Sequence, residues 1–122
     1  AEMVKACAEC IPYQVSDVVA ALRADTGIEL AELRVDGGPT RNRYLMQMQA
    51  DVTGATVVVS GLAELSAAGT AFVAGRAAGV WDHNVIYEQV ERRPFSPAME
   101  AGLREAKLAG WHAAVRQAMA HE

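Results

Sequence analysis

Two short strand-like runs, each followed by a helical pattern, most strongly limit how this chain can fold. The runs are ELRVD at residues 32–36 and TVVV at residues 56–59, and β-branched residues favour extended backbone. Apolar residues with helical spacing surround them, at about residues 3–25, 40–53, 63–79 and 97–120. The order helix, strand, helix, strand, helix is typical of an α/β unit with parallel strands and flanking helices.

Local signals add detail to the expected helices. Gly27 and Gly54 follow the first two helical patterns, where glycine commonly ends a helix. Pro12 lies inside the first pattern, so we expect a kink there or, as the alternative, a break. Residues 82–97 show no clear periodicity and allow one short strand at most. The last helix carries apolar residues on one face, namely Leu108, Trp111, Val115 and Met119.

The predicted sheet is small. Parallel sheets are normally covered on both faces and usually contain more than two strands. The sequence also begins at Ala1 in what reads as a helix interior, without a methionine or a capping residue. We therefore expect residues 1–122 to be part of a longer chain. The uncovered sheet edge and helix faces predict self-association, that is, a homo-oligomer.

Composition and charge exclude several classes of protein. The chain is 52% hydrophobic and 21% charged, which is typical of a packed globular domain and not of a disordered segment. A net charge of −4 and scattered basic residues argue against nucleic acid as a partner. No apolar run approaches the ~20 residues of a membrane span, and AEMVKACAEC lacks the features of a signal peptide. These properties predict a cytoplasmic protein that does not bind membranes.

Cys7 and Cys10 form a Cys-x-x-Cys pair, which suits half of a zinc site or a redox pair. Zinc would need two more ligands, but the histidines lie far downstream without a second paired spacing: His83, His112 and His121. Apolar residues of the same helical pattern recur at spacings of three and four: Val4, Cys7, Cys10 or Ile11, Val15, Val18 and Leu22. We therefore expect both cysteines to pack near the buried side of the helix, and we predict no metal site.

Gly37 and Gly38 join the first strand to the second helix in LRVDGGPTRNRYLMQ. The dipeptide has two interpretations. It can supply positive backbone dihedrals for a tight turn, or it can bring backbone amides close to an anion at the positive end of a helix dipole. Arg41 and Arg43 oppose the dipole in the first turn of the predicted helix, a cost of a few tenths of a kcal/mol each that a bound phosphate would reverse.

The longer segment LRVDGGPTRNRYLMQMQADVTG closely resembles the adenosine-side motif of the FGGY carbohydrate kinases, with a sequence like that of glycerol kinases. The similarity extends upstream through IPYQVSDVVAALRADTGIELAELRVDGG, and downstream through AELSAAGTAFVAGRAAGVW and VERRPFSPAMEAGLREAKLAGWHAAVRQAMA. It covers nearly the whole chain. The resemblance implies a ribonuclease H-like fold of the actin and Hsp70 ATPase type, with residues 1–122 forming the C-terminal part of the second kinase domain.

The resemblance also implies the site and the chemistry. Gly38 would offer its backbone to the nucleotide phosphates, Gly37 would support the turn, and Asn42 would contact the adenosine side. The cofactors would be ATP and Mg²⁺, and the acceptor would be a hydroxyl of a sugar or polyol. The family's catalytic base and acceptor-binding residues lie upstream of the matched region, so we assign no catalytic residue and expect the isolated chain to be inactive.

Two departures from the glycerol kinase pattern leave the acceptor open. The sequence differs from the usual glycerol kinase sequence at Pro39-Thr40-Arg41 and at the segment ELSAAG, residues 64–69. Both glycines and Asn42 keep their places. A pentulose kinase of the xylulose type is therefore an alternative. A non-catalytic binding or regulatory module with the ATPase-like fold is another, and a Cys-x-x-Cys metal or redox protein is a third.

Overall fold

The computed structural model describes residues 1–62, 65–82 and 90–120. Its helices and strands follow in the order α1 (Glu2–Thr26), β1 (Glu32–Val35), the 3-10 helix η1 (Gly38–Arg41), α2 (Arg43–Thr53), β2 (Thr56–Ser60), α3 (Leu65–Ala77), β3 (Arg92–Phe95) and α5 (Ala101–Met119). The expected elements are confirmed, with boundaries shifted by a few residues. Gly27 and Gly54 end α1 and α2 in the left-handed conformation, at φ 69° and 73°, as the sequence predicts.

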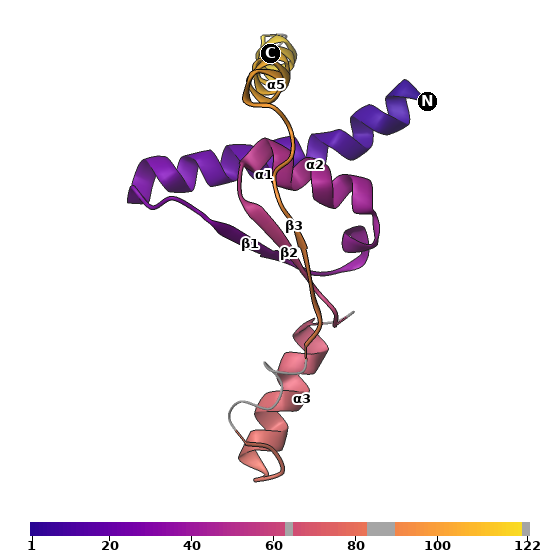
Figure 1. Ribbon diagram of the computed structural model, residues 1–122, viewed down its shortest axis with the longest axis vertical. Coiled ribbons are helices and arrows are strands. Elements are labelled where there is room, and N and C mark those ends of the chain that lie inside the picture. The colour runs from indigo at the N-terminus through magenta and orange to yellow at the C-terminus, as the bar shows by residue number, and fades with distance from the viewer. Residues whose placement is uncertain (63–64, 83–89, 121–122) are drawn as a thin grey trace.

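The three strands form one sheet in the order β1-β2-β3 (Figure 1). β1 and β2 are parallel, with Leu33 opposite Val57, which confirms the predicted α/β unit. β3 runs antiparallel to β2 and places Phe95 opposite Val57 from the other side. The expectation of a purely parallel arrangement is therefore incomplete, because one short strand from the stretch expected to be irregular joins the sheet.

The core lies between α2 and the sheet. Leu45, Met46 and Ala50 of α2 pack against Val57 and Val59 of β2, and Phe95 completes the cluster from β3. Leu33 and Val35 of β1 pack against this cluster and are only partly buried. α2 therefore covers the sheet through residues with helical spacing, and three successive valines of β2 are buried.

α1 packs against α2 with a different face from the one that its apolar pattern indicates. The residues that it buries are Glu9, Pro12, Ser16 and Val19, and the helix continues through Pro12 without the break that was considered. Most of the predicted apolar stripe is exposed, including Val4, Cys7, Ile11, Val18 and Leu22. The prediction that Cys7 is packed is therefore wrong, and Cys10 is half-buried.

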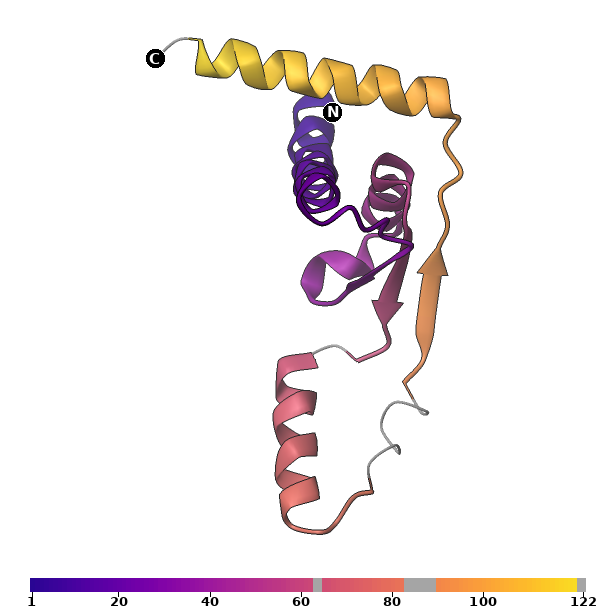
Figure 2. The same cartoon turned by 90° about the vertical axis from the view of Figure 1, so that its left-hand side faces the viewer.

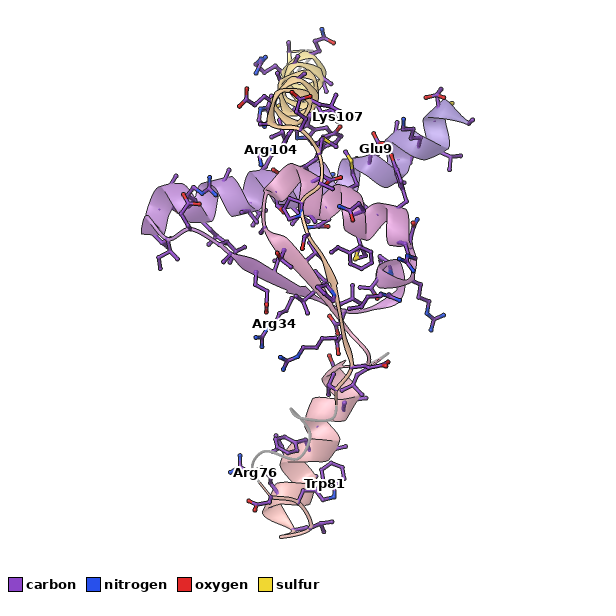
Figure 3. All side chains as sticks on the ribbon, viewed as in Figure 1. Glu9, Arg34, Arg76, Trp81, Arg104 and Lys107 are labelled. Atoms are coloured by element: carbon purple, nitrogen blue, oxygen red, sulfur yellow. The ribbon has the colours of Figure 1, made fainter. Side chains whose placement is uncertain are left out.

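Polar contacts explain why α1 turns this face to α2. Ser16 Oγ donates a hydrogen bond to the Val52 carbonyl at 3.2 Å, and the Tyr44 hydroxyl donates to the Glu9 carboxylate. Figure 3 shows Glu9 directed from α1 towards α2. This hydrogen bond, with burial as the next contribution, raises the pKa of Tyr44 to about 12. Buried polar groups need partners, and α2 supplies them.

The segment before α5 is tied to α2 by Asp51. Its Oδ1 atom accepts hydrogen bonds from the backbone N–H groups of Ala98 at 2.7 Å and Met99 at 3.1 Å. Gln47 Nε2 donates to the same carboxylate at 3.0 Å and to the Ser96 carbonyl at 2.9 Å. These contacts hold residues 96–99 outside the helix, so α5 begins at Ala101 and not at about residue 97.

α5 also contacts α1. Trp111 stacks on Tyr13 with ring centroids 5.4 Å apart, and Trp111 Nε1 donates to Asp17 Oδ2 at 2.8 Å. His112 Nε2 lies 2.8 Å from Asp17 Oδ1. Partial burial opposes ionisation of Asp17, but the contacts with Trp111 and His112 outweigh it and lower the pKa of the carboxyl. Met119, the last residue of the predicted apolar face of α5, is 70% exposed.

α3 and α5 lie at opposite ends of the molecule, and α3 extends away from the sheet (Figure 2). Trp81 folds back on α3, as Figure 3 shows, with its ring centroid 6.3 Å from that of Phe72. Gly75 leaves room for this indole, whose nearest atom lies 3.1 Å from where a Cβ would stand. None of the helices in the described ranges has both the length and the hydrophobicity that crossing a membrane requires.

Candidate nucleotide-binding pocket

The turn after β1 is built by Gly37 and a short 3-10 helix. Gly37 has φ 89° and ψ 179°, a backbone conformation that residues other than glycine rarely adopt. Thr40 donates to the Gly37 carbonyl twice, from its backbone N–H at 3.1 Å and from Oγ1 at 2.7 Å. The second helix therefore begins at Arg43, three residues later than expected from the sequence. Proline at position 39 and the locked Thr40 keep the intervening residues in a tighter turn.

This turn forms one wall of a pocket of about 630 Å³. The other walls come from residues 59–62, at the end of β2, and from residues 91–93, at the start of β3. Because β1 and β2 are parallel, both of their carboxyl ends open into the pocket. Ligands in open α/β sheets bind at this edge, and the volume lies within the usual range for small-molecule sites.

The pocket has a basic lining. The lining includes three arginines, Arg41, Arg92 and Arg93, and one acidic residue, Glu91. Guanidinium groups provide several N–H donors in a planar arrangement that matches phosphate. The pocket therefore suits an anionic ligand, although the chain as a whole has a net charge of −4.

The glycines of the pocket have three different functions. Gly37 provides the positive φ of the turn, whereas at Gly38 a Cβ atom would meet no atom within 4 Å. The Gly38 backbone is thus open to a ligand. Gly61 lies against β3: its N–H donates to the Glu91 carbonyl at 2.7 Å, and a Cβ there would stand 2.8 Å from that oxygen. Gly61 therefore lets the chain just after β2 approach the chain just before β3 closely.

Asn42 lies next to the pocket and outside its lining. Its side-chain oxygen accepts a hydrogen bond from the Leu45 N–H at 3.2 Å, so Asn42 is the N-cap of α2. The pocket therefore brings together Gly37 and Gly38 but not Asn42, whose contact with a nucleotide stays a prediction.

Asn42→Ala is expected to lower the free energy of unfolding of the chain by about 1 kcal/mol, since it removes this cap. Asn42→Asp keeps an acceptor oxygen at the same position and is expected to stay within a few tenths of a kcal/mol of wild type. Urea unfolding of the three proteins measures the difference. Equal stability of all three would contradict the capping assignment.

The sequence alone did not identify Gly61, Arg92 or Arg93 as pocket residues. Ser60-Gly61 directly after the second strand was an available signal, because neighbouring parallel strands end at the same edge of a sheet. The two arginines carried no such signal, since the sequence allowed one short strand within residues 82–97 but did not give its position or its partner.

Comparisons with known proteins agree with this architecture. Residues 1–78 match the C-terminal domain of the FGGY family of carbohydrate kinases. Glycerol kinase from Clostridium botulinum strain 657 is 44% identical over 119 residues, which is 96% of this chain and 24% of the relative. Glycerol kinase from Escherichia coli O139:H28 is 42% identical over 122 residues, with 98% of this chain and 24% of the relative covered. The chain thus spans about a quarter of the length of these relatives.

Two solved structures share the fold. Plasmodium falciparum glycerol kinase with ADP superimposes with a TM-score of 0.79 at 32% identity, over 93% of this chain and 23% of that one. A ligand-bound xylulose kinase from Lactobacillus acidophilus gives a TM-score of 0.76 at 20% identity, over 98% of this chain and 24% of that one, and indicates the fold alone. With the family match over most of its length and these relatives over nearly all of it, the chain belongs to the FGGY family of carbohydrate kinases.

Proposed function

We propose that this chain supplies the nucleotide-binding surface of an ATP-dependent kinase that phosphorylates a hydroxyl group of a polyol or sugar. The observation that carries the proposal is the pocket at the carboxyl ends of β1 and β2, where the open backbone at Gly38 lies beside three arginines. Identity of 42–44% with glycerol kinases favours a glycerol-like acceptor over a pentulose. The relative from Plasmodium falciparum was solved with ADP, which is the kind of ligand proposed here.

In this proposal, residues 1–122 form the C-terminal part of the second domain of a longer kinase. The catalytic base and the acceptor-binding residues are assigned to the rest of that protein, so the isolated chain is expected to transfer no phosphate. Within the chain, Gly37 shapes the turn, the Gly38 backbone faces the phosphates and Asn42 lies on the adenosine side. A homo-oligomeric, cytoplasmic enzyme remains a prediction.

Mg²⁺ accompanies ATP in this proposal and would neutralise charge on the phosphates during transfer. In residues 1–62, 65–82 and 90–120, no three His, Cys, Asp or Glu side chains gather as a metal site. In this proposal the ion reaches the site bound to the nucleotide phosphates. The part of this chain is to bind and orient the nucleotide through backbone amides and guanidinium groups, and positioning accounts for much of the catalysis of phosphoryl transfer.

Gly38→Val in the full-length protein that contains this chain is expected to raise KM for ATP by about tenfold, while KM for the acceptor stays within twofold. The valine side chain would occupy the open space beside the backbone and obstruct the phosphates. It would meet no other atom of the chain at Cβ, so the melting temperature should change little. Steady-state kinetics with each substrate varied in turn measure the effect.

Gly69→Val on α3 is the matched control, because its Cβ also meets no atom within 4 Å and it lies outside the pocket. Its KM for ATP is expected to equal that of wild type. Asn42→Asp tests the adenosine side separately, since it keeps the helix cap but replaces the amide donor. An unchanged KM for ATP in both Gly38→Val and Asn42→Asp would overturn the assignment of these residues to the nucleotide.

A further inference from the structure

Arg93 connects the outer strand of the sheet to the glycine turn. It lies on β3, which is separated from β1 by β2. Its Nη2 atom nevertheless donates a hydrogen bond to the Thr40 carbonyl at 3.2 Å, between residues that are 53 positions apart in the sequence. The side chain therefore spans the carboxyl end of β2 and reaches the turn that follows β1.

The guanidinium of Arg93 also contacts the ring of Phe95. Its Cζ atom lies 5.7 Å from the centroid of the Phe95 ring, a distance at which a cation interacts favourably with an aromatic face. Phe95 is a core residue, only 7% exposed. Residues two apart on a strand share one face, so Phe95 provides a rigid support for Arg93. This support gives the bond to Thr40 a defined direction.

The bond to Thr40 complements the contacts inside the turn. The N–H and the hydroxyl of Thr40 already bind the Gly37 carbonyl, and Thr40 is 8% exposed. Arg93 holds the remaining backbone polar group of Thr40, its carbonyl. Thr40 is thus fixed both to Gly37 and to β3. Gly38 lies between Gly37 and Thr40 in the sequence, and its backbone is open to the pocket.

We propose that Arg93 is a positioning residue of the nucleotide pocket: its guanidinium fixes the turn of residues 37–41 relative to β3, so that the Gly38 backbone faces the ligand. The proposal rests on the proposed function for the identity of the ligand. An arginine has five N–H donors in a fixed plane, and Arg93 lines the pocket. Lysine would keep the charge and N–H donors, but it would lose the planar guanidinium that lies over Phe95.

Arg92 provides a matched comparison. It lines the same pocket and carries the same charge, but the alternation of side chains along a strand directs it to the face opposite that of Arg93. A purely electrostatic contribution to anion binding would make Arg92→Gln and Arg93→Gln similar. A role in holding the turn would make them different.

The experiment compares Arg93→Gln, Arg93→Lys and Arg92→Gln in the full-length protein. Hydrogen exchange of the peptide covering residues 37–42, measured without nucleotide, should become faster in Arg93→Gln and stay unchanged in Arg92→Gln. KM for ATP should rise about fivefold in Arg93→Gln, with kcat and KM for the acceptor within twofold. Arg93→Lys should lie between wild type and Arg93→Gln in both measurements.

Unchanged exchange in Arg93→Gln, equally fast exchange in Arg92→Gln and Arg93→Gln, or an unchanged KM for ATP in Arg93→Gln would overturn the positioning role. Such a result would leave the proposed function intact, provided that wild type binds Mg²⁺-ADP. If wild type does not bind Mg²⁺-ADP, the proposed function and the nucleotide part of this inference both fail. The exchange measurement without nucleotide would still decide whether Arg93 holds the turn.

Discussion

Asp51→Ala is expected to lower the free energy of unfolding of the chain by about 3 kcal/mol, because hydrogen bonds to charged groups are worth roughly 1.5–3 kcal/mol each and the carboxylate accepts more than one. Asp51 is 8% exposed. The backbone N–H groups of Ala98 and Met99, at 2.7 and 3.1 Å, would both lose their acceptor. Urea unfolding followed by circular dichroism measures the change.

Two other variants make this prediction specific. Asp51→Asn keeps an acceptor oxygen and should lose less, about 1 kcal/mol, since neutral hydrogen bonds are weaker. Asp25→Ala removes an exposed carboxylate near the end of α1 and should stay within about 0.5 kcal/mol of wild type. If Asp51→Ala were as stable as Asp25→Ala, the carboxylate would not hold the segment before α5.

Gly61→Ala is expected to destabilise the chain by about 2 kcal/mol, the usual cost of forcing an extra carbon into a packed contact. The new Cβ would stand 2.8 Å from the Glu91 carbonyl oxygen and 3.0 Å from the Glu91 Cβ. One of these atoms belongs to the backbone, so relief requires β2 and β3 to separate at the pocket. The hydrogen bond that the Gly61 N–H donates to the Glu91 carbonyl would lengthen as a result.

The opposite sign is expected for Gly69→Ala. Gly69 lies inside α3, where a Cβ would meet no atom within 4 Å, and replacing glycine by alanine within a helix stabilises it by about 0.5–1 kcal/mol. Thermal unfolding of both variants beside wild type gives the comparison. A stabilised Gly61→Ala would contradict the close approach of β2 and β3.

The sequence predicted the elements whose signals are local. Gly27 and Gly54 marked the ends of α1 and α2, because positive φ at a helix terminus is a property of a few residues. The valine run at residues 57–59 marked a strand, because β-branched residues favour extended backbone locally. The Gly37-Gly38 turn was predicted from its position between a strand and a helix, and it lines the pocket.

Features that depend on distant parts of the chain were not predicted. The stripe that includes Val4, Cys7 and Val18 has correct helical spacing, but which face of a helix is buried depends on the partner that it meets. α1 meets α2 through Glu9 and Ser16. The apolar pattern records the hydrophobicity of that face and does not specify what covers it.

The position of β3 and the place of its arginines in the pocket were not predicted, for a related reason. The strand reads RRPF, which has no alternation of apolar and polar residues, and Pro94 lowers the expectation of a strand. Proline is tolerated because β3 pairs with β2 alone in the described sheet. Arg93 lies near Thr40 because β3 pairs antiparallel with β2. The residues next to Arg93 and Thr40 in the sequence give no sign of this contact.

The most direct test of the account is hydrogen exchange of the full-length protein with and without Mg²⁺-ADP, resolved by peptide. We expect ADP to slow exchange in the peptides that cover residues 37–42 and 59–62, which line or adjoin the pocket. The peptide of α3, residues 65–77, lies outside the lining and serves as the internal control. ADP that binds and protects other segments, while residues 37–42 and 59–62 exchange as in the free protein, would contradict the placement of the nucleotide in this pocket.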